Sequence, residues 1–227
     1  MNNSRIVGKE IKLIENEIKK ITLKLVNKGL VVNQNWPEIF HEGDCIEIGW
    51  QGQKRTGLLF KDVPYREIYD TIAKDRNFNF VFFDGSIVQI LYRFSRNNLI
   101  SHRLAYYPCP DSGEFFSTVF QDGGYESTEM IDYLPKNELM LPLRFDFRFS
   151  NENEAHSLTH IHLCNYQNCR IPVSSPITPS LFLDFVLRNF YPALFKDFHS
   201  TLNLKFNKIF KETITKTESN ILHFSYS

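Results

Sequence analysis

Four consecutive segments decide the fold: PLRFDFRF (142–149), THIHL (159–163), CRIPVSSPITP (169–179) and LFLDFVLRNFY (181–191). In the first, phenylalanines alternate with charged residues, which is the two-residue period of a strand that buries one face. A slip of one residue would bury the charged side chains, so the register of this strand is strongly fixed. The second and third segments predict strands at 158–164 and 170–174. The fourth is apolar nearly all round, which is typical of a buried helix, and Thr178-Pro179 marks its start.

Three further strands with tight connections are expected upstream, at 78–83, 87–95 and 100–107. The pairs Asp84-Gly85 and Asn97-Asn98 between them are typical of hairpin turns, so these strands form an antiparallel meander.

A second hairpin is expected within residues 45–60, with its turn at 51–53, and the pair Trp36-Pro37 before it is interpreted as a linker. A helix is expected over 62–75, because Pro64 stands in its first turn and apolar residues recur along one face.

The N-terminal 1–30 segment predicts an amphipathic helix from Arg5 to Lys28. One apolar stripe runs along it, made of Val7, Ile11, Ile14, Ile18, Ile21 and Leu25. Gly29 is well placed to follow the helix C-terminus. The stripe could pack on the domain's own sheet or on a second chain, as in a short coiled coil, and packing within the chain is favoured.

Residues 111–137 are rich in acids and glycines and are interpreted as a long loop with one helical turn, which could act as a flap or contact a partner. A second C-terminal helix is expected over 193–216 and a last strand over 221–226. Residues 1–227 are therefore predicted to form a single α+β domain. It contains an antiparallel sheet of about six to eight strands, covered by helices on one face.

Composition excludes several classes of protein. The formal net charge is zero, so the chain lacks the overall basic character of many nucleic-acid-binding proteins. The four cysteines match no zinc-ribbon or CxxC spacing. No signal-peptide core or run of 18 apolar residues occurs, so a cytoplasmic protein with reduced thiols and no membrane contact is expected.

The densest group of chemically active side chains lies on the strands at 142–174. Residues two apart on a strand share a face, so His160 and His162 point together while Ile161 and Leu163 are expected in the core. The same alternation joins the charged residues of the preceding strand. The predicted common surface carries Arg144, Asp146, Arg148, His160, His162, Arg170 and Ser174. Either His102 or Arg103 must face the same way, and Arg103 is assigned to the site.

Three chemistries fit this group. In the first, His160, His162 and Asp146 are catalytic: the imidazoles move protons, the carboxylate orients them, and the arginines with Ser174 bind a phosphate. In the second, the two histidines and the carboxylate hold a metal ion. In the third, the surface binds nucleic acid or protein without a reaction. A structural interpretation also remains, in which Asp146 pairs with arginines and the histidines fill polar gaps. The sequence names no cofactor.

The segments SHRLAYYPCP, PLRFDFRF, THIHL and CRIPVSSPITPSLFLDFVLRNFY together resemble a family of bacterial proteins known as domain of unknown function number 2290. The resemblance covers roughly residues 40–195 and implies no reaction. Proteins of this kind often occur among bacterial defence genes. The resemblance therefore implies either a nuclease-type effector or a non-catalytic subunit of a defence complex. Such a subunit would bind nucleic acid, or a partner protein through the 1–28 helix or the 111–137 loop.

Overall fold

The computed structural model describes residues 8–53, 63–120, 130, 141–149, 158–164, 169–204 and 209–226. Its strands are β1 (Val31–Gln34), β2 (Pro37–Glu42), β3 (Cys45–Trp50), β4 (Phe80–Phe82), β5 (Ile87–Ser95), β6 (Asn98–Tyr107), β7 (Leu143–Arg148), β8 (Thr159–Leu163) and β9 (Arg170–Pro172). Its helices are α1 (Lys9–Asn27), α2 (Tyr65–Lys74), α3 (Ser112–Val119), α5 (Pro179–Phe190), α6 (Pro192–Leu202) and the 3-10 turn η1 (Glu218–Asn220).

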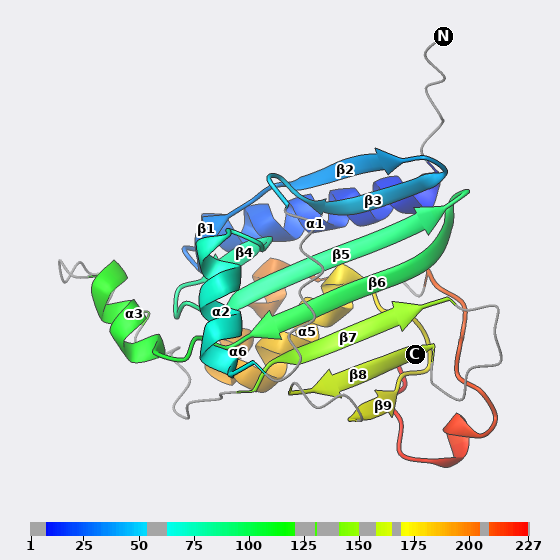
Figure 1. Ribbon diagram of the computed structural model, residues 1–227. Helices are drawn as coiled ribbons and strands as arrows, with labels where there is room; N and C mark the ends of the chain where they lie inside the picture. Colours follow the sequence, from blue (N-terminus) through cyan, green and yellow to red (C-terminus); the bar gives the residue numbers. More distant parts are fainter. Residues whose placement is uncertain are drawn as a thin grey trace, which may run out of the picture.

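The strands of the described residues form one antiparallel sheet in the order β1-β4-β5-β6-β7-β8-β9, with β3 also on β5 and β2 on β3 (Figure 1). The predicted meander is confirmed as β4, β5 and β6. Gly85 in its first turn has a φ of 86°, which favours glycine over any residue with a Cβ. The α+β class and the antiparallel sheet are thus confirmed.

Helices α1, α5 and α6 lie together on one face of the sheet (Figure 1). Their apolar side chains form one core with alternate residues of the central strands, such as Ile90, Tyr92 and Phe145. Helix α2 packs on the opposite face at one end of the sheet, where Ile68 and Ile72 form a smaller cluster with residues of β4, β5 and β6. The described helices therefore leave the second face of β7, β8 and β9 uncovered, and this face carries the site.

The N-terminal helix belongs to the core. The isoleucines of its stripe are buried: Ile11, Ile14, Ile18 and Ile21. The helix ends in a Schellman motif, because Leu30 N–H donates to Leu25 O and Gly29 N–H to Val26 O, with Gly29 at a φ of 68°. Packing within the chain is thus confirmed; Val7 of the predicted stripe lies outside the described residues.

The hairpin formed by β2 and β3 differs from the one predicted within residues 45–60. Pro37 opens β2, so Trp36-Pro37 is not a linker. β2 pairs with β3 through a turn at Gly43, with Ile39 opposite Ile48. Proline is tolerated here because β2 pairs only with β3 and its other edge has no strand among the described residues. The predicted return strand at 56–60 lies outside the described residues.

Three predictions for other segments are wrong. Residues 112–119 form a two-turn helix, α3, where a loop with one turn was expected; most of the rest of 111–137 lies outside the described residues. Helix α6 ends at Leu202, short of residue 216, because Asn203 adopts a left-handed conformation with a φ of 42°. Residues 221–226 form no strand, and only Phe224 bridges to Val173.

Candidate functional site

Strand register brings the predicted site residues together. Asp146 on β7 is directly opposite Arg103 on β6 and His160 on β8. One step along, His162 is opposite both Arg144 on β7 and Arg170 on β9. Side chains directly opposite on neighbouring antiparallel strands lie on one face with Cβ atoms about 4.5–5.5 Å apart. The alternation read from the sequence therefore places these six residues in two adjoining rows.

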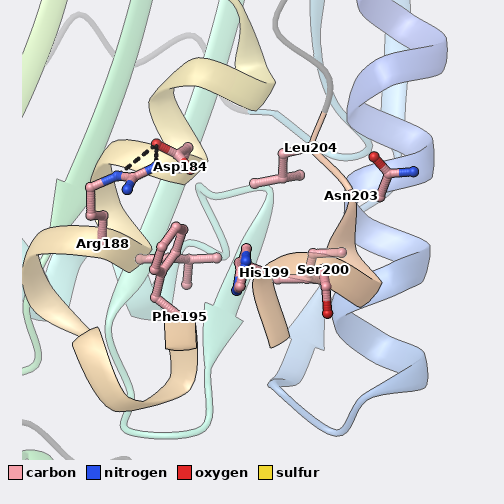
Figure 2. A pocket seen from close by; sticks show the side chains of 9 residues that line it. Asp184, Arg188, Phe195, His199, Ser200, Asn203 and Leu204 are labelled. Carbon is pink, nitrogen blue, oxygen red and sulfur yellow. Dashed lines mark hydrogen bonds and ion pairs between the residues drawn. The ribbon is translucent and has the colours of Figure 1, made fainter. Parts of the chain in front are cut away.

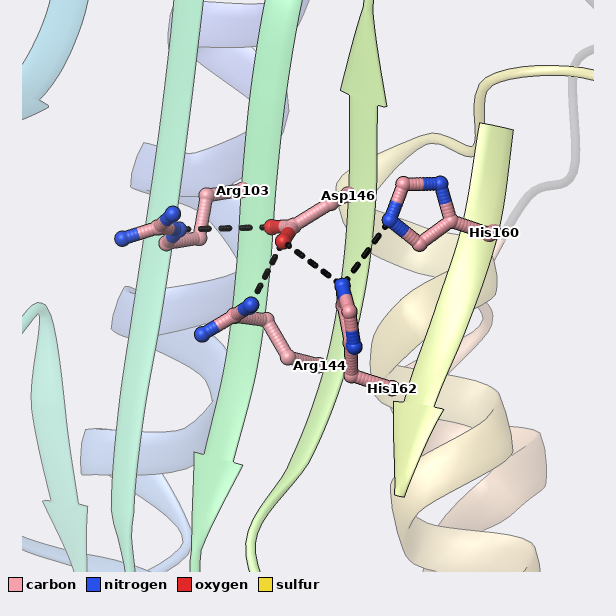
Figure 3. A network of polar contacts seen from close by, with 5 residues as sticks. All are labelled: Arg103, Arg144, Asp146, His160 and His162. Atoms are coloured by element: carbon pink, nitrogen blue, oxygen red, sulfur yellow. Dashed lines mark hydrogen bonds and ion pairs between the residues drawn. The ribbon is translucent and has the colours of Figure 1, made fainter. Parts of the chain in front are cut away.

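Asp146 is the centre of the contacts (Figure 3). Its Oδ2 accepts a hydrogen bond from Arg144 Nε at 2.7 Å, and its Oδ1 accepts one from Arg103 Nε at 3.3 Å. His162 Nε2 lies 3.8 Å from Oδ2. The Nε2 atoms of His162 and His160 are 2.9 Å apart, with the two rings edge to face. We refer to Arg103, Arg144, Asp146, His160 and His162 as the site cluster.

The cluster keeps Asp146 ionised. Burial by itself would raise the pKa of this carboxyl, but Arg144 and Arg103, and then the two imidazoles, outweigh it and hold the pKa below its usual value. The carboxylate side chain is 15% exposed, whereas that of Arg103 is 50% exposed. A buried anion thus anchors guanidinium groups that reach into solvent.

The imidazole of His162 is neutral at pH 7. Burial, together with the neighbouring charge of Arg144, lowers its pKa to about 4, and Asp146 only partly opposes the shift. One ring must therefore donate an N–H to the other across the 2.9 Å contact, or both Nε2 atoms must share another partner. A neutral imidazole can accept a proton or ligate a metal, but it is a poor proton donor at this pH.

Two other predicted site residues, Arg148 and Ser174, make no contact with the site cluster among the described residues. Arg148 is on the same face, opposite Ser101, and is exposed. Ser174 follows the end of β9 and is buried; its backbone bonds to Phe224, and its Oγ has no hydrogen-bond partner among the described residues. No contact between Ser174 and the cluster occurs in the described part of the chain.

Two residues near the site, Leu163 and Arg93, differ from what the sequence predicts. Leu163 was expected in the core, but it is 40% exposed at the end of β8, so that expectation is wrong. Arg93 was not assigned to the site, although the register puts it opposite Ser101 and hence in line with Arg148. On β5, Arg93 lies on the side opposite the buried Ile90 and Tyr92. Only the pairing of β5 with β6 and of β6 with β7 shows which residues stand beside it.

His102 points the other way, into the core. It accepts a hydrogen bond from the backbone N–H of Ile177 at 3.3 Å and packs against Tyr92 and Phe147. Of the two candidates on this strand, Arg103 is therefore the one that joins the site.

A hollow of about 280 Å³ lies on the helix side of the molecule, between α5 and α6 (Figure 2). Arg188 on its wall forms an ion pair with Asp184 at 3.0 Å and covers the ring of Phe195. The charges of Arg188 and Asp184 offset each other, whereas the site cluster has two arginines on one aspartate, so the cluster offers more positive charge to a ligand.

The comparisons with known proteins give a family and no activity. Residues 30–226 match the family described as "Uncharacterized conserved protein (DUF2290)". The chain belongs to this family. No curated protein and no solved structure matches the chain. Membership in DUF2290 covers the whole sheet and every residue of the site cluster, but the family description assigns no role to any of them. None of the described helices combines the length and apolar character needed to cross a bilayer.

Proposed function

We propose that this DUF2290 protein binds the phosphate groups of nucleic acid on the uncovered face of β6 to β9, and that it acts as a nuclease-type effector of a bacterial defence or toxin system. The observation that supports this most is the way Asp146 holds two arginines. Both Arg103 and Arg144 bond to it through Nε, and no contact among the described residues occupies their terminal Nη groups.

The bonds through Nε hold both guanidinium groups in place and leave their Nη donors available to bind an anion. Each Nη group carries donors in a fixed plane, which match the oxygens of a phosphate. Fixing the side chains in advance reduces the entropy lost on binding. Arg148 and Arg170 add two exposed charges on the same face. The four arginines outnumber the one aspartate, so the face is locally basic although the chain is neutral overall.

The two imidazoles are the groups in this cluster that would act on the bound phosphate ester. They lie beside Asp146, one strand away from Arg144. In this role His162 accepts a proton or binds an ion, and it does not serve as the acid. Asp146 orients the arginines and His162.

Binding is tested with labelled single-stranded and duplex oligonucleotides of DNA and RNA, by fluorescence anisotropy at several salt concentrations. Arg144→Ala should weaken binding roughly tenfold, the effect expected for one charged hydrogen-bonded contact. It should also lower the slope of log affinity against log salt by about one. Arg188→Ala is the matched control, because it removes one paired arginine from the opposite side. Equal losses in both variants, or no binding by the unmodified protein, would contradict the proposal.

Cleavage is tested separately on the same oligonucleotides. The His160→Ala/His162→Ala double variant should lose cleavage, and in buffer that contains a chelator it should bind the oligonucleotides as the unmodified protein does. If the unmodified protein binds but never cleaves, the nuclease part of the proposal fails and the alternative of a non-catalytic subunit is favoured. Because the apolar stripe of α1 is buried in the chain's own core, a partner of such a subunit would bind the outer side of this helix.

A further inference from the structure

We infer that Asp146, His160 and His162 form a binding site for one divalent transition-metal ion beside the phosphate-binding arginines. The role given to the ion rests on the proposed function. The existence of the site is argued from geometry alone. Each of the three side chains offers one ligand atom, and these atoms all lie within 4.8 Å of one another. They are the one group of three such residues found among the described parts of the chain.

The distances suit a single ion. A metal about 2.0–2.2 Å from each ligand places two ligands at right angles about 3 Å apart, and no two ligands more than about 4.4 Å apart. The two Nε2 atoms, 2.9 Å apart, match the right-angle case. His162 Nε2 and Asp146 Oδ2, 3.8 Å apart, match a wider angle. The ligand atoms of the third pair, Asp146 and His160, lie within the 4.8 Å that encloses all three.

The ligand set indicates the kind of metal. Two imidazole nitrogens and one carboxylate oxygen suit zinc, manganese, iron, cobalt or nickel; magnesium and calcium prefer oxygen ligands alone. Three protein ligands leave further coordination positions open. All three residues stand on the two neighbouring strands β7 and β8, which gives a more rigid support than a loop would.

The arginines act as the outer layer of this site. Arg103 bonds to Oδ1 of the ligating carboxylate, and Arg144 bonds to Oδ2, the oxygen nearer His162. A carboxylate oxygen has two lone pairs, so Oδ2 can serve both Arg144 and an ion. The positive charges weaken the binding of a bare cation, and they favour an anion that bridges metal and guanidinium. Metal and phosphate should therefore strengthen each other's binding, by the reciprocity of linked equilibria.

A direct N–H···N bond between the two imidazoles would give the same 2.9 Å distance without a metal. Metal binding by the purified protein distinguishes the two explanations. The full-length chain, stripped with chelator and dialysed at neutral pH, is titrated with Co²⁺, Mn²⁺ and Zn²⁺. Calorimetry gives the stoichiometry and affinity, and visible absorption reports the Co²⁺ ligand field.

We expect one equivalent of Co²⁺, absorption bands typical of nitrogen and oxygen ligands, and a raised melting temperature. His162→Gln, which keeps a polar side chain of similar length, should lose at least tenfold in affinity, and His160→Gln likewise. His41→Gln is the control, because His41 lies on β2, away from the cluster. Circular dichroism shows whether each variant is folded.

The inference is overturned if the unmodified protein binds no Co²⁺ beyond what the double variant His160→Gln/His162→Gln binds, or if His41→Gln loses as much as His162→Gln. If a variant fails to fold, the visible spectrum of the unmodified protein with Co²⁺ still decides the question, because it shows whether nitrogen and oxygen ligands bind the ion. If the unmodified protein binds oligonucleotides but no metal, this inference fails and the proposed function stands. Metal binding without oligonucleotide binding removes the proposed function and leaves the metal site standing.

Discussion

The substitution Tyr191→Phe tests how a buried carboxylate is held at the junction of α5 and α6. Asp84, in the turn between β4 and β5, is 1% exposed. It accepts hydrogen bonds from the Tyr191 hydroxyl at 2.7 Å and from the backbone and hydroxyl of Ser86 at 2.9 and 3.1 Å. Tyr191 follows the last residue of α5, so this bond ties the helix layer to the turn. Phenylalanine keeps the ring and removes the hydroxyl, and with it both the donor to Asp84 and the 2.9 Å hydrogen bond to the Tyr106 hydroxyl.

The expected cost follows from the charge of the acceptor. A hydrogen bond to a charged group contributes about 1.5–3 kcal/mol to stability, against about 0.5–1.5 kcal/mol for one between neutral groups. Tyr92→Phe is the matched control, since the Tyr92 hydroxyl is also buried and donates to the neutral carbonyl of Ile177 at 2.7 Å. Where the pH leaves Asp84 ionised, Tyr191→Phe should therefore lower the free energy of unfolding by about 1 kcal/mol more than Tyr92→Phe does.

Acidity should change this difference. Burial raises the pKa of Asp84 above its ordinary value of 3.8, and the bonds from Ser86 and Tyr191 only partly oppose the shift. The folded state then binds a proton more readily than the unfolded state, so this group adds stability as the pH falls through its folded pKa. Because protonation removes the charge that needs the hydroxyl, the excess cost of Tyr191→Phe should shrink in acid.

The assay is urea denaturation followed by circular dichroism at pH values from 5 to 8, with both variants and the unmodified protein measured together. Equal losses for Tyr191→Phe and Tyr92→Phe at every pH would refute the reasoning, because they would show that Asp84 does not depend on this donor. A Tyr191→Phe loss that grows in acid would refute the assigned sign.

Two further predictions concern the core. His102 has its pKa lowered from 6.5 to about 4, first because burial disfavours its charge, so the unfolded state binds the proton more readily between these values. The free energy of unfolding should fall by about 3 kcal/mol as the pH drops from 6.5 to 4, and urea denaturation should show a shallower fall for His102→Gln. Ile18→Ala should cost about 2–5 kcal/mol, because this α1 side chain is fully buried; Leu23→Ala, at a half-exposed position of the same helix, should cost little. Equal costs at the two positions would contradict the assignment of α1 to the core.

Much of the site was predictable because its information is local. The alternation in RFDFR and in THIHL sets which side chains share a face, and the pairing of β7 with β8, two strands that follow each other along the chain, brings the two sets together. What the sequence could not show is which residues stand opposite one another across strands. That register makes Asp146 the partner of both Arg103 and His160, and the two-residue period is the same for every register of matching parity.

The misjudged segments share a physical cause, which is that their structure depends on distant contacts. Pro37 starts a strand only because β3 supplies a partner on one side. Residues 221–226 have the apolar pattern of a strand, yet they make only one bridge, from Phe224 to Val173 just after β9. Local propensity is a weak guide wherever tertiary pairing decides the outcome.

The position of the site within the family match affects how the proposals should be tested. The match begins at residue 30, after α1, and includes all the residues of the cluster. Helix α1 nevertheless covers the core face of the sheet, with Ile14 and Ile18 fully buried. Over β7 to β9 the two faces of the sheet therefore differ: the described helices cover one face (Figure 1), and the other carries the arginines and histidines of the cluster. Substitutions on the cluster face should therefore change binding with small effects on unfolding, and substitutions under α1 should do the reverse.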